Sequence, residues 1–274
     1  MNKKTISPLF EPGEKRIGFS NWIGLQTLCL KEISRFFKVW TQTLLAPCVT
    51  TLLFMAIFVW ALGGAGRVSG DFPFSTFLAP GLIIMAVIQN AFQNPASSIL
   101  IGKVQGSITD VLMPPLSALE LSIGFAVGGV VRGLMVGCCV WLVFFIIPVI
   151  DMSISHVWAI FYFMISASLM LSLVGILTGI WAEKFDHGSA ITNFVIMPLS
   201  LLSGTFYSIT RLPETMQIFS YFNPFFYLID GFRYGFLGGA DSNLVSGVGF
   251  TLLLNIALAL SVYLVIRSGY KLKT

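Results

Sequence analysis

The sequence predicts an all-α integral membrane protein, and two observations support this fold class. First, 56% of the 274 residues are hydrophobic, only 10% are charged, and the mean hydropathy is +0.87. A soluble domain carries about 25% charged residues, so most of the surface of this chain is expected to face lipid. Second, the apolar residues form long continuous runs and do not alternate with polar ones, which favours membrane-spanning helices.

Six apolar segments are long enough to cross a bilayer core of about 30 Å, which takes about 20 helical residues. We expect these spans near residues 43–62, 74–100, 121–150, 157–181, 190–207 and 244–266. The third segment is longer than a span requires, so it is expected to tilt or to extend past the bilayer. No repeat or linker divides the chain, and we expect a single membrane domain over residues 1–274.

Lysine and arginine are distributed unevenly over the segments that connect the spans. If the N-terminus is inside, the cytoplasmic segments hold 12 of the 16 basic residues, the external segments hold three, and Arg132 lies within a span. Short cytoplasmic segments of membrane proteins are enriched in these residues. The distribution therefore predicts that both termini lie in the cytoplasm.

Residues 22–40, which precede the first span, have the pattern of an amphipathic helix. Apolar side chains recur every three or four residues from Trp22 to Trp40, and polar side chains that include Lys31 and Arg35 occupy the other face. Such a helix is expected to lie in the cytoplasmic interface of the membrane. Two roles fit this pattern equally, a passive anchor and a lever packed beside a cytoplasmic partner.

Two polar features lie inside predicted spans. The second span ends with a band of amides, formed by Gln89, Asn90, Gln93 and Asn94, and the third span contains Arg132. Polar groups at this depth are expected to face other helices or a wet cavity, so these five are candidate pathway or interface residues. The alternatives are ordinary hydrogen bonding between helices for the amides and snorkelling to the membrane surface for the arginine.

The predicted cytoplasmic loop over residues 101–120 has its own local structure. A short helix is expected to begin near Gly106, a Met-Pro-Pro corner follows at residues 113–115, and residues 117–120 have the spacing of a capping box that opens the next helix. A loop of this construction suits the transmission of force from a soluble partner. A plain connector is the alternative.

A second irregular segment, residues 208–243, lies between the fifth and sixth spans on the predicted outer side. Pro213 and Glu214 begin a short apolar helix, Asn223 and Pro224 interrupt it, and a second apolar stretch follows. Each stretch is about half as long as a span, which is typical of a hairpin that enters and leaves the membrane at one face. The sequence therefore predicts an external re-entrant helical hairpin.

The C-terminal half of the chain carries a specific pattern, which is accompanied by the Met-Pro-Pro corner and by the sequence GGVVRG at residues 128–133. The pattern consists of Ser203, Gly204, Tyr207, Leu212, Pro213, Asn223, Pro224, Tyr227 and Arg233. With these features the chain resembles the ABC-2 type permeases, the membrane subunits of bacterial ABC exporters. The resemblance covers nearly the whole chain.

The resemblance implies a permease of an ATP-driven exporter in the bacterial inner membrane, working as a homodimer or as a pair of different permeases with two cytoplasmic ABC ATPase subunits. The residues implied for ATPase coupling are Gly106, Asp110, Met113, Pro114, Pro115 and Leu116. Those implied for an external gate are Gly204, Tyr207, Leu212, Pro213, Asn223, Pro224, Tyr227 and Arg233. The implied cargo is an amphipathic, lipid-linked or glycan-type molecule, or a drug.

Several classes of function lack their characteristic residues in this sequence. There is no Walker-type phosphate loop, so ATP and Mg²⁺ are expected on the partner subunit and no cofactor on this chain. We expect no catalytic residue, no metal site and no nucleic-acid partner, and membrane lipids as the surroundings. An ion-coupled secondary transporter and a membrane-embedded lipid or glycan enzyme are the alternatives. Asp230, Arg233 and Asp241 come closest to an acidic cluster, and we interpret them as ion pairs that fix the hairpin.

Overall fold

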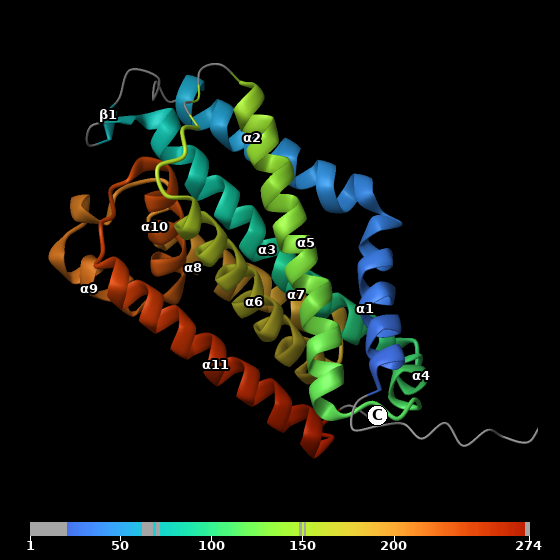
Figure 1. The fold of residues 1–274 in the computed structure, drawn as a ribbon. Helices are drawn as coiled ribbons and strands as arrows, with labels where there is room; N and C mark the ends of the chain where they lie inside the picture. The colour runs from blue at the N-terminus through green and yellow to red at the C-terminus, as the bar shows by residue number, and fades with distance from the viewer. Residues whose placement is uncertain (1–20, 62–67, 70–71, 148–149, 151, 272–274) are drawn as a thin grey trace, which may run out of the picture.

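The protein is a bundle of helices that run side by side around a central helix, α3 (Phe74–Val104) (Figure 1). The computed structural model describes residues 21–61, 68–69, 72–147, 150 and 152–271. Within these residues the one departure from helix and loop is an antiparallel pair of two-residue strands, β1 (Val68–Ser69) and β2 (Phe72–Pro73). The prediction of an all-helical protein is therefore confirmed.

Five helical segments of the described chain are long and apolar enough to cross a membrane. They are α2 (Ala46–Ala56) with its flanking π-helical turns η1 (Thr41–Leu45) and η2 (Ile57–Ala61), then α3, α5 (Ala118–Ile146), α6 (Val157–Trp181) and α11 (Leu244–Ser268). They correspond to the first, second, third, fourth and sixth predicted spans, with ends that differ by a few residues. The third has 29 residues and is long, as the sequence predicts.

The fifth predicted span, residues 190–207, takes a different form. The chain is helical from α7 (Phe185–Ile191) through the π-helical turn η4 (Thr192–Ile196) to α8 (Met197–Leu202), and it then leaves the helix. Gly204 follows with a φ of 78°, a left-handed conformation that ends a helix and favours glycine. This segment is not among the five span-like helices, so a sixth crossing stays a prediction.

Two short helices lie between α8 and α11, as expected for the predicted hairpin. They are α9 (Glu214–Phe222) and α10 (Pro224–Leu237), and they meet at the predicted break. The Asn223 Oδ1 accepts a hydrogen bond from the Phe225 amide at 3.0 Å, and Pro224 occupies the first helical position of α10. The Asn223 Nδ2 also donates to the Ser203 Oγ at 2.7 Å, so the break itself is tied to the end of α8.

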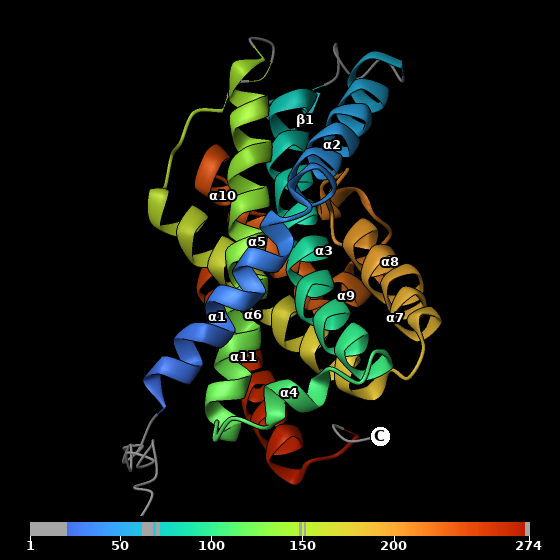
Figure 2. The ribbon, with the colours of Figure 1, turned by 90° about the vertical axis from the view of Figure 1, so that its right-hand side faces the viewer.

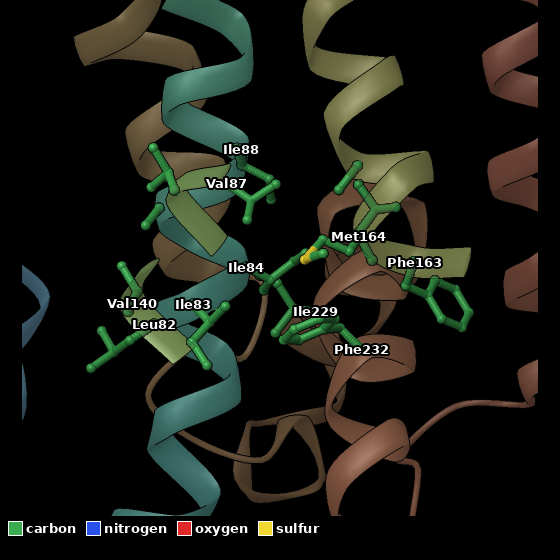
Figure 3. Packing of buried hydrophobic residues seen from close by; sticks show 14 of the residues in the cluster. Leu82, Ile83, Ile84, Val87, Ile88, Val140, Phe163, Met164, Ile229 and Phe232 are labelled. Carbon is green, nitrogen blue, oxygen red and sulfur yellow. The ribbon is translucent and has the colours of Figure 1, made fainter. Parts of the chain in front are cut away.

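The hydrophobic core lies where α3 packs against α5, α6 and α10 (Figure 3). Ile84 of α3 and Ile229 of α10 are both completely buried in it. Gly231 allows α10 to approach α6 closely, because a Cβ atom built there would lie 2.2 Å from the Phe163 ring. Thus α10 is a core helix, whereas α9 exposes 69% of Phe219 and 79% of Phe222.

The helix α1 (Trp22–Phe37) is present where the amphipathic pattern predicts it. Its buried residues are Leu28, Glu32 and Phe36, which recur at four-residue spacing. A Cβ atom built on Gly124 of α5 would lie 2.4 Å from Leu28, so α1 packs closely against α5. The buried face therefore contacts protein and includes a carboxylate.

Candidate functional site

A pocket of about 490 Å³ lies between α1, the first part of α2, α3 and α5. Figure 2 views the molecule from this side, with α1 in front of α5 and the start of α2 near α3. The polar lining of the pocket includes Arg35, Gln42, Gln89, Asn90, Gln93 and Arg132. The apolar lining of the pocket includes Phe54, Leu82 and Met85. The structure thus places four of the five candidate pathway residues around one pocket, and the fifth, Asn94, lies beside it.

Arg132 is almost completely buried, with 8% of its surface exposed. Its Nη2 donates a hydrogen bond to the Asn90 Oδ1 at 2.9 Å, and the Asn90 Nδ2 donates to the Ala86 carbonyl at 3.0 Å. Arg132 lies one turn of α5 beyond Gly128, where a Cβ atom would lie 2.6 Å from Glu32 of α1. Its guanidinium lines the pocket beside α1.

Glycines on α5 hold Arg132 in this place. A Cβ atom would lie 2.3 Å from the Ser172 Oγ at Gly129 and 2.7 Å from the Ser168 Oγ at Gly133, so a larger residue would separate α5 from α6. Close approach through small residues is the usual means of packing membrane helices. The GGVVRG sequence is therefore a packing motif that carries a cation.

Arg35 of α1 joins the same pocket, and the sequence did not predict this role. Its Nη2 donates to the Asn94 carbonyl at 2.5 Å and its Nη1 to the Ser97 Oγ at 3.2 Å. The Glu32 carboxylate lies 3.6 Å from its Nε and accepts from the Ser98 Oγ at 2.7 Å. Burial lowers the pKa of the Arg35 guanidinium, and the neighbouring Glu32 opposes this shift. The available signal was an acidic residue at the four-residue spacing of the buried face of α1.

The residues predicted for ATPase coupling lie together at one end of the molecule. They surround α4 (Ile108–Leu112), which Figures 1 and 2 place at the end where α1 begins and α11 terminates. Gly106, Asp110, Met113, Pro114 and Pro115 are exposed, with Met113 at 80%, and Leu116 is half-buried. The predicted capping box is present between Ser117 and Glu120, so the loop turns rigidly into α5.

The residues predicted for the external gate lie around α8, α9 and α10. The Tyr207 hydroxyl donates to the Leu202 carbonyl at 3.3 Å, and the Tyr227 hydroxyl donates to the Tyr221 carbonyl at 3.0 Å. Pro213 precedes the first residue of α9, and the Leu212 carbonyl accepts from Gln217 at 2.8 Å. Of these contacts, the one between Tyr227 and Tyr221 joins α10 to α9, whereas the others are local to the end of α8 and the start of α9.

Arg233 and Asp230 of α10 fix two different loops. Arg233 donates to the Gly204 carbonyl at 2.7 Å, and its guanidinium lies 3.8 Å above the Phe77 ring. Asp230 accepts from the Asp241 amide at 2.9 Å and from the Ser242 hydroxyl at 2.6 Å. Within the described chain no ion pair shorter than 4 Å joins these groups, so the prediction that ion pairs fix the hairpin was wrong. Each charged side chain instead forms hydrogen bonds to a loop. Through these hydrogen bonds α10 connects the end of α8 to the start of α11.

The family model of the ABC-2 type transporters matches residues 24–237. The chain therefore belongs to this family and is a membrane transport permease, and the family implies association with ABC ATPase subunits. Among similar proteins are the inner membrane transport permeases YadH of Escherichia coli K12, Escherichia coli O157:H7 and Shigella flexneri. Each is 37% identical over 255 residues, which cover 92% of this chain and 98% of the relative.

Proposed function

We propose that the protein is the permease of an ATP-driven exporter and that two copies form the pathway between them. The observation that carries this proposal is the filled interior of the single chain. Helix α3 is 89% buried over its most apolar stretch, and the core around it is closely packed (Figure 3). Cargo therefore moves along a face of the subunit, where the pocket with Arg132 lies.

The outer surfaces of α2 and of the segment from η4 to α8 are suited to a second copy. They expose large apolar side chains, which include Val49 at 54%, Leu53 at 58% and Phe194 at 81%. Apolar faces of this kind pack against another helix or against lipid. A homodimer joined here would convert the pocket on each subunit into part of an enclosed path.

The proposed topology has six crossings, both termini in the cytoplasm and α9 and α10 as a re-entrant pair on the outer side of the bacterial inner membrane. The segment from α7 to α8 supplies the fifth crossing in this scheme. Support comes from the asymmetry of basic residues and from the short lengths of α9 and α10, nine and 14 residues. The hairpin closes the path externally, and α10 couples it to α8 and α11.

The exposed surface around α4 is the proposed contact with the ATPase subunits, which bind ATP and Mg²⁺. Met113 at its tip is a large apolar side chain that is exposed to water, and Pro114 and Pro115 make its support stiff. Closure of the ATPases would push on α4 and thereby on the ends of α3 and α5. The cargo expected for this path is amphipathic.

Affinity purification from the native membrane tests this proposal. We expect an ABC ATPase to purify with the wild-type chain and the substitution Met113→Asp to lower its amount about tenfold, as for an apolar anchor at an interface. Met216→Asp on α9 is the matched control, because Met216 is also an exposed methionine, at 51%, and lies outside the α4 surface. An unchanged amount of ATPase with Met113→Asp would reject the α4 contact, and uptake driven by an ion gradient without ATP would reject the exporter.

A further inference from the structure

Arg132 is a buried cation that forms no ion pair with any carboxylate of the described residues. Its guanidinium donates a hydrogen bond to a neutral amide, that of Asn90, and its Nε has no hydrogen-bond partner among the described residues. The ion pairs of the described chain are Arg35 with Glu32 and Lys271 with Glu183, and neither includes Arg132. The other guanidinium that lines this pocket is that of Arg35, which is paired with Glu32. An isolated charge at this depth is expensive, so a mobile anion that enters the pocket would be held strongly.

The spans of this chain do not supply the missing negative charge. The five span-like helices carry a single acidic residue, Glu120, and this carboxylate accepts from the Ser117 and Asn21 amides at the cytoplasmic end of α5. The exposed helical stretches over residues 41–59 and 192–202 carry none. A second copy that packs through these stretches therefore brings no carboxylate to Arg132. Glu32, the buried carboxylate of α1, already contacts Arg35 and Ser98. Among the described residues Arg132 therefore has no carboxylate of its own, and an anionic ligand would supply one.

The rest of the pocket complements such a molecule. Arg35 adds a second guanidinium to the lining, and Gln89 and Gln93 add amide groups that can donate hydrogen bonds. Phe54 and Met85 provide an apolar wall next to these donors. Guanidinium groups bind phosphate and carboxylate oxygens in a forked geometry, and an adjacent apolar wall favours an alkyl chain.

We propose that the pocket binds the anionic headgroup, a phosphate or a carboxylate, of an amphipathic molecule. Arg132 contacts the anion, Arg35 lines the pocket with a guanidinium whose charge is balanced by Glu32, and the apolar wall contacts the first part of the alkyl chain. This inference rests on the proposed function, because it names the charge of the exported cargo. Binding can be measured without the ATPase and without transport, so the site and the export function can fail separately.

The test measures binding to the purified full-length chain in nanodiscs of uncharged phosphatidylcholine. The probes are dodecyl phosphate, inorganic phosphate and the uncharged dodecyl maltoside. Binding of each probe is measured by calorimetry and by the rise in the melting temperature of the protein. We expect dodecyl phosphate to bind at least about tenfold more tightly than dodecyl maltoside, and Arg132→Gln to weaken it about tenfold or more, as for the loss of a charged hydrogen bond. Arg132→Lys keeps the charge and should recover part of the affinity.

Arg267→Gln is the matched control, because Arg267 is an exposed arginine on α11 and does not line the pocket. Competition by inorganic phosphate alone would support a site for the free anion, whereas competition that requires the dodecyl chain would support a site for the amphipathic one. Equal binding of the charged and uncharged probes would overturn the proposal. So would an unchanged affinity in an Arg132→Gln variant that melts at or above the wild-type temperature.

Discussion

Arg132 and Arg233 are both buried arginines, exposed by 8% and 4%, yet their surroundings differ in kind. Arg233 bonds the Gly204 carbonyl, covers the Phe77 ring and is attracted by Asp230 and Asp241. Arg132 donates a hydrogen bond to a neutral amide and faces a pocket that a second arginine also lines. A cation that is compensated by its own chain holds the fold together. A cation that is not compensated is available to a ligand.

The largest expected effect is the loss of protein stability when Arg233 is replaced, compared with the effect of replacing Arg132. Arg233→Gln leaves the Gly204 carbonyl without its donor and the Asp230 charge without its nearby cation, so we expect a loss of about 3 kcal/mol in the free energy of unfolding. Arg132→Gln removes an uncompensated charge and should change stability by less than about 1 kcal/mol, or raise it. Unfolding in mixed micelles measures both. Equal losses for the two substitutions would remove the distinction between a structural and a binding arginine.

A smaller effect is expected where α10 packs into the core. Gly231→Ala places a Cβ atom 2.2 Å from the Phe163 ring and should cost about 2 kcal/mol through overpacking. Gly239→Ala is the matched control, because nothing lies within 4 Å of a Cβ atom at Gly239. Comparing the melting temperatures of the two variants measures this loss of stability. A Gly231→Ala variant as stable as the control would mean that α10 is less firmly seated than Arg233 and Asp230 indicate.

The smallest effect is expected for an exposed charge pair. Lys271 lies 2.7 Å from Glu183 and holds the pKa of that carboxyl below its ordinary value. The contribution of this pair is present above the pKa of the unfolded state and is lost as the pH falls through the lower folded value. Because exposed pairs contribute little, Glu183→Gln should leave the melting temperature at pH 7 almost unchanged. A shift as large as that of Arg233→Gln would show that exposure is a poor guide to the role of a charge here.

Much of the fold could be predicted from the sequence because spans and breaks are local properties. The apolar runs gave five span-like helices within a few residues, and Asn223 with Pro224 separates α9 from α10 as expected. The helical segment at the fifth predicted span begins at Phe185 and ends before Gly204, so its bounds differ from the predicted 190–207, and a crossing there stays a prediction. Hydropathy does not register a helix end that depends on backbone conformation.

The candidate site was predictable only in part. The amides of the second span and Arg132 are conspicuous because polar groups are rare inside spans. Arg35 was not found, because a basic residue on an amphipathic helix is expected to face lipid headgroups. The structure instead lays α1 across α3 and α5, buries Glu32 completely and brings Arg35 to the pocket.

The sequence by itself determined the membrane class, the places of five long helices and the position of the break at Asn223 and Pro224. These follow from composition and from short-range propensities, which any stretch of about 20 residues already contains. Only the tertiary structure decided which charges meet. Arg132 is 42 residues from Asn90 and Arg35 is 59 from Asn94, so their contacts depend on how whole helices pack. That packing separates the arginine that fixes the fold from the one that faces the proposed path.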